Sequence, residues 1–371
     1  MRATRTLRRP RVLIVGCGDV GMRCVELLRP RAHLYALTSH PERCTELRAA
    51  GVSPLVGDLD VRRSLRRLGG LAPTVLHLAP PQKDGELDRR TRALIAALTA
   101  QPLRAARATL KTAAPVARLR RLRGASMRPQ PTNIVPDGVH RPTQGSSRGR
   151  MRKPVLQTGR PVPRSLPGIG KRWVNPLHAA PRVVYASTTG VYGDCGGAWI
   201  DETRPVRPAN PRAQRRVSAE RLLRKATARG SIAASVARIP GIYAGNRLPL
   251  ARLEKRTPAL LDVDDVYTSH IHADDLAAIL VRMTTRGRPA RVVHASDDSG
   301  MKMGEYFDAV ADAFGVARAP RISRDAAEQQ IDPMLLSFMR ESRRLINRRL
   351  KEELRVRLRY PSVDDFLATL E

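Results

Sequence analysis

The sequence predicts an α/β protein built on a doubly wound parallel sheet. Three observations carry this prediction. Short apolar runs alternate with helix-like segments over much of the chain, glycine or proline bounds most of these runs, and a glycine-rich turn joins the first run to the first helix. The 371 residues, 42% of them hydrophobic, suffice for a sizeable core, and with only 4% aromatic residues its filling must be aliphatic.

The first hundred residues hold four expected strands, each followed by a helix-like segment. Each strand is expected where a short apolar run ends in turn residues, at residues 11–16, 33–38, 52–59 and 74–80. The helices are expected at residues 21–28, 41–51, 61–70 and 88–100. Gly51 closes the second helix, as glycines commonly do at helix C-termini.

The alternation resumes near residue 182. A strand is expected at 182–188, a helix at 219–230 and a further strand at 231–241. Beyond Gly241 the pattern is mixed, but residues 335–358 carry an apolar stripe at helical spacing that we expect to lie in the core. Its members are Leu335, Phe338, Met339, Leu345, Ile346, Leu350 and Leu354.

Residues 101–180 interrupt the pattern. They hold 17 of the 67 lysines and arginines and 11 of the 29 prolines against one acid, Asp137, in a chain of formal net charge +33. Such a segment buries too little apolar surface to offset its ordering entropy, so we predict a disordered basic insertion. A nucleic-acid-binding arm is one interpretation. A tolerated surface-loop expansion, or even the translation of a shifted reading frame, is favoured, because aromatic side chains are not interleaved to stack bases.

The cysteines and the N-terminus indicate the compartment. Cys17, Cys24, Cys44 and Cys195 form no CxxC pair and no zinc-like cluster, so they are expected as small apolar fillers in a reducing compartment. The apolar run at residues 12–15 is too short for a signal-peptide core, and no run is long enough to span a membrane. The sequence therefore predicts a cytoplasmic, soluble protein.

The sharpest motif is the GxGxxG turn GCGDVG, which runs from Gly16 through Asp19 and Val20 to Gly21. It follows a strand and opens a helix, the context in which this motif binds a dinucleotide. Gly16 permits the tight turn, Gly18 lets the backbone approach a pyrophosphate, and Gly21 allows close packing of helix and strand. The helix N-terminus adds N–H groups for the anion. The alternative is a helix-start loop whose glycines serve the fold alone.

The identity of the dinucleotide depends on the end of the second strand. An acidic residue there would bind the ribose 2′-hydroxyl of NAD, but none lies between Glu26 and Glu42. Thr38, Ser39 and Arg43 are instead suited to donate to a 2′-phosphate, which favours NADP over NAD. Arg43 is equally explained as an exposed residue at the start of a helix, so NAD stays open.

Six motifs occur in an order that is more specific than any one of them. Together they resemble the extended or atypical short-chain dehydrogenase/reductases, the NAD-dependent epimerase/dehydratase-like proteins, over nearly all of the chain except residues 101–180. The motifs are GCGDVG, GDL at 57–59, HLAPP at 77–81, STTGVYGD at 187–194, RIPGIYAG at 238–245 and IHADDLA at 271–277.

The resemblance implies a Rossmann-type domain and a small, mainly C-terminal substrate domain. The Rossmann domain would span 1–240, interrupted by the insertion, and the substrate region 241–371, with 268–295 returning to the first domain. A small hydroxyl- or carbonyl-bearing substrate is the expected partner, with a sugar derivative as one candidate class. Homodimers through two helices are common in the family, whereas neither nucleic acid nor a membrane is an expected partner.

The resemblance also assigns cofactor contacts. Asp58 and Leu59 would flank the adenine, and Ala79 and Pro80 would line the cofactor path. Asp58 is alternatively a helix cap.

Further along the chain, Pro240 and Ile242 would border the nicotinamide. Thr188, three residues before the VYG sequence, falls where the family places its carbonyl-polarising serine or threonine. Its alternative role is to satisfy backbone groups at a strand end.

One family feature is missing. The family transfers a proton through a tyrosine that is followed four residues later by a lysine, just before a helix that carries a glutamate. Counting back from Glu220 puts Arg216 at the lysine position and Arg212 at the tyrosine position. A guanidinium stays protonated near neutral pH and cannot exchange this proton. Arg216 can still hold ribose hydroxyls, and Arg212 can clamp an anion or stabilise an oxyanion.

Proton transfer then needs a substitute. Tyr192, Tyr243 and an ordered water are the candidates, although Tyr192 belongs to the VYG motif and packing explains it as well. His270 and His272 stand close to Asp274 in the sequence. The family has a strand-to-helix junction there, which would make Asp274 a helix cap and leaves no metal site expected.

Two functions follow from these residues, with a third behind them. The first is an NAD(P)-dependent oxidoreductase or epimerase-like enzyme that acts on a small hydroxyl- or carbonyl-bearing substrate. The second is a catalytically silent dinucleotide sensor or scaffold, because arginines stand in place of the tyrosine and the lysine. The third is a nucleic-acid-associated protein that uses residues 101–180.

Overall fold

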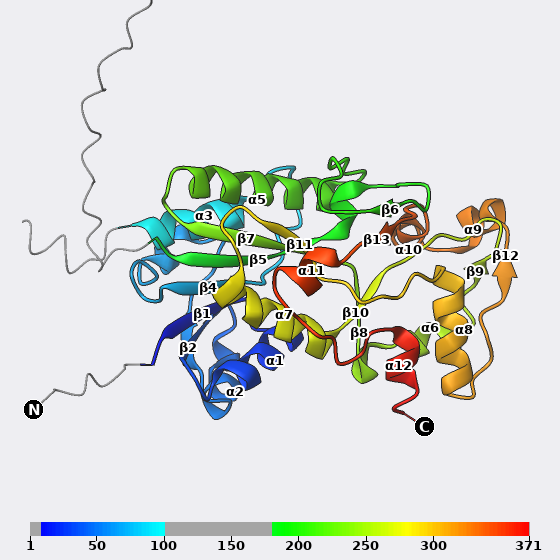
Figure 1. The fold of residues 1–371 in the computed structure, drawn as a ribbon, viewed down its shortest axis with the longest axis horizontal. Helices are drawn as coiled ribbons and strands as arrows, with labels where there is room; N and C mark the ends of the chain where they lie inside the picture. Colours follow the sequence, from blue (N-terminus) through cyan, green and yellow to red (C-terminus); the bar gives the residue numbers. More distant parts are fainter. Residues whose placement is uncertain (1–8, 101–179, 371) are drawn as a thin grey trace, which may run out of the picture. The chain divides into compact units, whose positions relative to one another are not determined.

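The computed structural model describes residues 9–100 and 180–370. Their centre is a seven-stranded sheet in the order β11-β7-β5-β4-β1-β2-β3 with every neighbouring pair parallel, which confirms the predicted doubly wound sheet (Figure 1). The strands are β1 (Arg11–Val15), β2 (His33–Thr38), β3 (Ser53–Val56), β4 (Thr74–His77), β5 (Arg182–Thr188), β7 (Ala233–Ile239) and β11 (Val292–His294). The predicted disordered insertion and its nucleic-acid interpretation lie outside the described residues.

Helices cover both faces of the sheet. Figure 1 shows α3 (Arg89–Thr99) and α5 (Pro211–Ala228) on one face, and α1 (Asp19–Leu28) and α7 (Ala273–Arg286) on the other. The short α2 (Cys44–Ala49) packs Leu47 into the same core as α1 and α7. Within the described ranges, no helix combines the length and the apolar character needed to cross a membrane.

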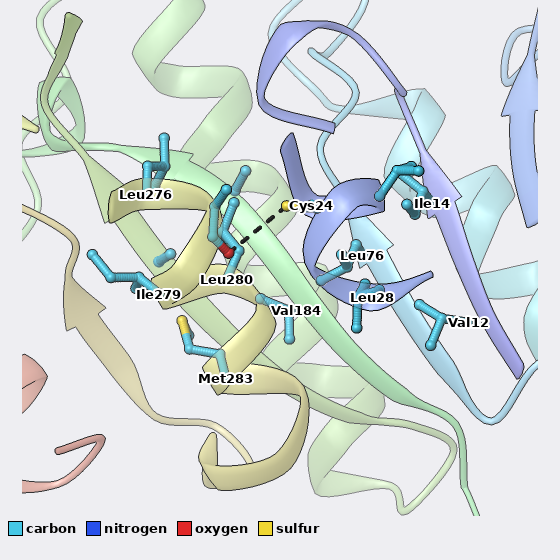
Figure 2. Packing of buried hydrophobic residues seen from close by; sticks show 14 of the residues in the cluster. Val12, Ile14, Cys24, Leu28, Leu76, Val184, Leu276, Ile279, Leu280 and Met283 are labelled. Atoms are coloured by element: carbon cyan, nitrogen blue, oxygen red, sulfur yellow. Dashed lines mark hydrogen bonds between the residues drawn. The ribbon is translucent and has the colours of Figure 1, made fainter. Parts of the chain in front are cut away.

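The core beneath α1 and α7 shows how the predicted elements pack. Figure 2 shows apolar side chains of both helices against the strands, and the Cys24 thiol lies 3.8 Å from the carbonyl oxygen of Ala277. Burial raises the pKa of Cys24 to about 12, so its thiol stays protonated and acts as a filler. The labelled side chains are Val12, Ile14, Cys24, Leu28, Leu76, Val184, Leu276, Ile279, Leu280 and Met283.

The remaining elements are short and form the C-terminal part of the molecule together with β6 (Trp199–Ile200). Three two-stranded parallel pairs, β10-β8, β12-β9 and β13-β6, supplement the main sheet. These elements are β8 (Gly241–Tyr243), α6 (Leu250–Glu254), β9 (Ala259–Leu260), β10 (His270–His272), α8 (Met303–Ala313), β12 (Arg321–Ile322), α9 (Arg324–Gln330), α10 (Pro333–Phe338), β13 (Arg344–Leu345), α11 (Arg348–Glu352) and α12 (Val363–Leu367). Aromatic side chains of α8 and α12 share a separate core with Tyr243 and Leu253.

Helix α5 begins eight residues earlier than the sequence pattern predicted. The Asn210 side chain accepts a hydrogen bond from the backbone N–H of Ala213 at 2.9 Å, and Pro211 occupies the first helical position. The apolar periodicity starts only at Val217, which is why the pattern missed the first two turns. Arg212 and Arg216 therefore lie on a helix.

The helix expected at 61–70 was also too long. Only the 3-10 turn η2 (Arg62–Leu65) forms there. The helix expected at 41–51 divides into the 3-10 turn η1 (Pro41–Arg43) and α2.

The apolar stripe at residues 335–358 is not one helix. It divides into α10, β13 and α11, because β13 pairs with β6 and interrupts the helical backbone. Leu335 and Ile346 were wrongly placed in the core, since they are 41% and 38% exposed. Met339, Leu345, Leu350 and Leu354 are buried as predicted.

The junction before α7 corrects one detail. The cap is His272, not Asp274: the His272 Nδ1 accepts from the backbone N–H of Asp274 at 3.2 Å. The Asp274 carboxylate instead pairs with Arg23 on α1. In the described part of the chain, no three His, Cys, Asp or Glu side chains gather as they would around a metal ion.

Ala100 and Arg182, which lie on either side of residues 101–179 in the sequence, are both next to one turn. α3 ends at Thr99, and a Cβ placed on Gly69 would lie 2.7 Å from the carbonyl oxygen of Ala100. β5 begins at Arg182, whose backbone N–H donates to the carbonyl of Pro73 at 2.8 Å. Both ends therefore contact the turn at residues 69–73, at the amino edge of the sheet.

Candidate functional site

A cavity of about 310 Å³ opens at the carboxyl ends of β1, β2, β3 and β4. Ligands of open α/β sheets bind at this edge. Nine of the residues predicted to contact a dinucleotide line the cavity, although they come from four separate loops. They are Gly16, Gly18, Thr38, Ser39, Arg43, Asp58, Leu59, Ala79 and Pro80.

The three glycines of the loop serve different purposes. Gly16 has φ +89°, and a Cβ there would lie 2.5 Å from the Ala79 backbone nitrogen, so no other residue fits. A Cβ on Gly21 would lie 3.0 Å from the Gly16 carbonyl oxygen, where α1 approaches the loop. A Cβ on Gly18 would meet nothing within 4 Å, because this glycine borders the open cavity.

The loop fits a pyrophosphate group. Gly18 is the N-cap of α1, and no side-chain cap occupies the first amides of that helix among the described residues. Backbone N–H groups at a helix N-terminus attract an anion through their partial positive charge. The bare backbone at Gly18 and the open space beside it are what a dinucleotide phosphate requires.

The other two loop residues lie outside the cavity wall. The Asp19 carboxylate pairs with Arg23 and with Arg247, each at 3.2 Å. Val20 is partly buried against the core of α1 and α7. Asp19, Val20 and Gly21 therefore hold α1 and the loop in place. These three residues do not line the cavity.

Arg43 ends the 3-10 turn η1 and lines the same cavity. Its Nη1 donates to the Cys17 carbonyl at 2.8 Å, which ties it to the glycine loop. Its other nitrogens contact both oxygens of Glu46, at 2.9 and 3.0 Å. Thr38 is buried, and its hydroxyl oxygen accepts from the backbone N–H of His40 at 3.1 Å. Arg43 is thus a fixed cation beside Ser39.

A larger and strongly basic cavity of about 840 Å³ adjoins the first. The two share Leu59, Pro80 and Arg90. Two acids line the larger cavity. Asp60 pairs with Arg90 at 2.6 Å, and Asp84 is exposed. Its basic lining consists of Arg62, Lys83, Arg89, Arg90, Arg92, Arg212, Arg215 and Arg216. We call this space the basic cavity.

Two further cavities continue the path. A central cavity of about 700 Å³ shares Lys83, Arg212 and Arg215 with the basic cavity and reaches Thr188. A cavity of about 310 Å³ adjoins it along Pro240 and is lined by Ile242 and by aromatic side chains of the C-terminal part. The residues predicted for the nicotinamide end therefore lie on this path, beyond the basic cavity.

The two arginines at the family's tyrosine and lysine positions face this path. The Arg216 Nη1 donates to the Ala186 carbonyl at 2.6 Å and to the Tyr185 hydroxyl at 3.2 Å. Burial lowers the pKa of Arg212, and the nearby charge of Arg216 lowers it further. Burial raises the pKa of Tyr185 to about 12 and, together with Arg216, lowers that of His77 to about 3. Neither arginine carries an exchangeable proton near neutral pH.

Thr188 ends β5 and lines the central cavity. Its hydroxyl oxygen accepts from the backbone N–H of Gly190 at 3.3 Å, where it caps the 3-10 turn η4 (Thr189–Tyr192). The hydroxyl hydrogen is still able to donate to a substrate oxygen. Thr188 therefore satisfies a backbone group at a strand end, which was its alternative role. It does so at the position where the resemblance expects a residue that polarises a carbonyl.

Tyr192 is held in a buried network away from the cavities described above. Its hydroxyl lies 2.7 Å from Arg238 Nη1 and 2.6 Å from His294 Nε2, and burial raises its pKa to about 12. Tyr243 donates to the Ser362 carbonyl at 3.1 Å, and burial raises its pKa as well. These contacts give both tyrosines structural roles.

Glu341 is a site residue that sequence reasoning missed. It lines both the central cavity and the adjoining cavity that contains Ile242, with 11% of its side chain exposed. Its carboxylate accepts from Asn210 Nδ2 at 3.3 Å and from Arg343 Nη1 at 2.9 Å. Glu341 follows α10 in a segment without any motif, so only the tertiary fold brings it beside α5.

Residues 173–295 match the model of the NAD dependent epimerase/dehydratase family. No curated protein matches the chain. The matched residues include Thr188, Arg212, Arg216 and Pro240.

Solved structures share the fold. A functionally unknown conserved protein from Silicibacter pomeroyi is 23% identical with a TM-score of 0.61, covering 97% of this chain and 98% of that one. MoeE5 in complex with UDP-glucose and NAD is 17% identical, with a TM-score of 0.59 and 97% of each chain covered. DesIV, a dTDP-glucose 4,6-dehydratase from Streptomyces venezuelae, is 16% identical with a TM-score of 0.60, covering 97% of this chain and 95% of that one. The family-model match confirms, over residues 173–295, the resemblance to the NAD-dependent epimerase/dehydratase family that the ordered motifs predicted, and the solved structures add the shared fold.

Proposed function

We propose that this protein binds a nicotinamide dinucleotide in the glycine-loop cavity and uses it to oxidise or reduce a small hydroxyl- or carbonyl-bearing substrate. The observation that carries the proposal is Gly18, where bare backbone at the start of α1 faces open space. MoeE5 and DesIV were both solved with NAD, and MoeE5 with UDP-glucose. These ligands support a sugar-derived substrate, which is the class we favour.

NADP is the dinucleotide that we favour. Arg43 is anchored by the Cys17 carbonyl at the adenosine side of the cavity, next to Ser39. A 2′-phosphate placed there would compete with Glu46 for the guanidinium, and a dianion pairs with arginine more strongly than a carboxylate does. Among the residues that the structure describes, Asp58 is the one acid that lines this cavity, so a ribose 2′-hydroxyl has few acceptors there.

The chain's own residues then divide the work around the reacting carbon. When bound, the dinucleotide supplies the hydride acceptor or donor. Thr188 donates to the substrate oxygen, and Arg212 stabilises negative charge that develops on it. Glu341 accepts the hydroxyl proton when an alcohol is oxidised and returns it in the reverse direction. Arg216, fixed by Ala186, holds the ribose hydroxyls.

The direct test is hydride transfer. Purified protein with labelled NADPH or NADH is offered a panel of carbonyl compounds and nucleotide sugars, and transfer of the label is expected. Glu341→Gln keeps the shape and the contact with Arg343 but cannot take up a proton, so turnover is expected to fall at least about 100-fold. The exposed Glu254→Gln is the matched control and is expected to keep full activity. Equal rates in the two variants would remove Glu341 from the mechanism.

A silent dinucleotide sensor is the second candidate. The observation that favours it is that Arg212 and Arg216 occupy the two positions from which the family transfers its proton, and both face the cavities. In this case the dinucleotide binds and stabilises the protein, but no label is transferred.

Restoring the family pair separates the two candidates. The double variant Arg212→Tyr with Arg216→Lys regains a phenol next to an ammonium that lowers its pKa. For a silent sensor, we expect label transfer in the double variant and none in the wild type. Arg212→Phe with Arg216→Lys is the matched control, since it lacks only the hydroxyl. Transfer by the wild type that the double variant reduces would contradict the silent candidate.

A further inference from the structure

The geometry points to an anion-binding site at the junction of the basic and central cavities, where Lys83, Arg212 and Arg215 line both spaces. The ligand is an oxyanion group, carboxylate or phosphate, carried by the substrate next to its reacting hydroxyl. This inference rests on the proposed function only in assigning the anion to the substrate. We call these three residues the cationic junction.

The helix α5 places the arginines together. Arg212, Arg215 and Arg216 stand three and four residues apart, so they share one face over the first two turns. The helix N-terminus, capped by Asn210, adds a partial positive charge at the same end. Like charges so close repel one another, and burial together with Arg216 lowers the pKa of Arg212. A bound oxyanion relieves that repulsion.

Arg215 is the second and independent observation. Its side chain is buried, with 8% exposed, yet it lines both cavities. Nη1 donates to the Gly85 carbonyl at 2.8 Å, while Nε has no hydrogen-bond partner in the described part of the chain. A buried N–H group that lacks a partner is unfavourable, and guanidinium groups bind carboxylates and phosphates through two parallel N–H groups. Nε itself is enclosed, but the guanidinium borders both cavities and keeps unused donor capacity that an oxyanion bound there would take up.

Three acids lie near the junction, and the charge of one of them, Glu341, raises the pKa of Arg212. Asp60 is committed to Arg90, and Asp84 is exposed in the loop that also carries Lys83. Glu341 lies in the central cavity and is bound by Asn210 and Arg343. The walls of the two cavities together carry nine lysines and arginines against these three acids, an excess of positive charge that favours an anionic substrate group.

The test uses anions as probes on the full chain. Inorganic phosphate and malonate are titrated by calorimetry at constant ionic strength, each with and without saturating NADPH. We expect saturable binding of at least one anion that persists when NADPH is bound. Arg215→Gln is expected to weaken it at least tenfold. Arg221→Gln, which removes an exposed charge from the same helix, is the matched control and is expected to change it less than twofold.

Lys83→Gln covers the case in which the buried Arg215 variant fails to fold, because Lys83 is exposed, and it is expected to weaken binding as well. Equal weakening by Arg221→Gln would reduce the effect to general charge and overturn the inference. Loss of anion binding when NADPH is added would assign the junction to the phosphates of the dinucleotide and also overturn it. NADPH binding without anion binding would leave the proposed function intact, whereas anion binding without NADPH binding would contradict the proposed function alone.

Discussion

Gly18→Trp is expected to abolish dinucleotide binding while the protein stays folded. A Cβ at this position meets nothing within 4 Å, so the substitution has room in the fold, but the indole ring would fill the cavity beside the helix N-terminus. We expect the dissociation constants of NADPH and NADH to rise at least about 100-fold, which corresponds to about 3 kcal/mol. The wild type is expected to bind NADPH more tightly than NADH, because of Arg43.

The measurement is a calorimetric titration of both dinucleotides, with circular dichroism to verify folding. Val263→Trp adds the same bulk at a residue that is 86% exposed and outside the cavities, so it is expected to bind like the wild type. Gly18→Ala should lie between the two. Unchanged affinity in Gly18→Trp would show that dinucleotides bind elsewhere.

Arg238→Met is expected to lower the free energy of unfolding by about 3–5 kcal/mol, the range found when one partner of a buried ion pair is removed. Arg238 on β7 is only 2% exposed and contacts both carboxylate oxygens of Glu220 on α5, at 3.1 and 2.7 Å. It also donates to Tyr192, and Glu220 accepts from Ser187 at 2.7 Å. Without the arginine, the buried Glu220 carboxylate keeps only the exposed Arg224, at 3.4 Å, as a cationic partner.

The double variant Glu220→Met with Arg238→Met provides the control. It removes both charges, so we expect it to recover much of the lost stability, as apolar replacements of buried pairs often do. Urea unfolding followed by circular dichroism gives the free energies. A loss below about 1 kcal/mol in Arg238→Met would mean that the pair is accessible to solvent and would contradict the buried network.

Local patterns predicted the central sheet well. The strands at His33–Thr38 and Arg182–Thr188 have the predicted boundaries, because each is an unbroken apolar run between turn residues. The glycine loop was equally readable, since the conformation of Gly16 and the close approach at Gly21 are local requirements. Nine predicted cofactor residues gather around one cavity because the carboxyl ends of parallel strands share one edge.

Features that depend on distant segments were not predictable. The first turns of α5 are polar and carry no stripe, so the arginines could not be placed on a helix before Asn210 was seen to cap it. The apolar residues at 335–358 recur at helical spacing, although β13 in this segment pairs with β6 as a strand. This pairing joins residues that are far apart in the sequence, so the local pattern could not reveal it. Glu341 is held in the site by its contacts with Asn210 and Arg343. Arg343 in turn donates to the carbonyl of Gly193. Tertiary packing decides such cases.

The turn at residues 69–73 has a consequence for protein engineering. Because Ala100 and Arg182 both adjoin it, any sequence placed between these two residues closes as a loop at this turn. The entropy of closing such a loop grows only with the logarithm of its length, so inserts of very different sizes are compatible with one scaffold. The carboxyl edge of the sheet, with its cavities, is at the other end of the strands. New chain termini placed between Ala100 and Arg182 would give a circular permutant, or a two-fragment version of the protein. In either form, the segments that line the cavities keep their covalent connections.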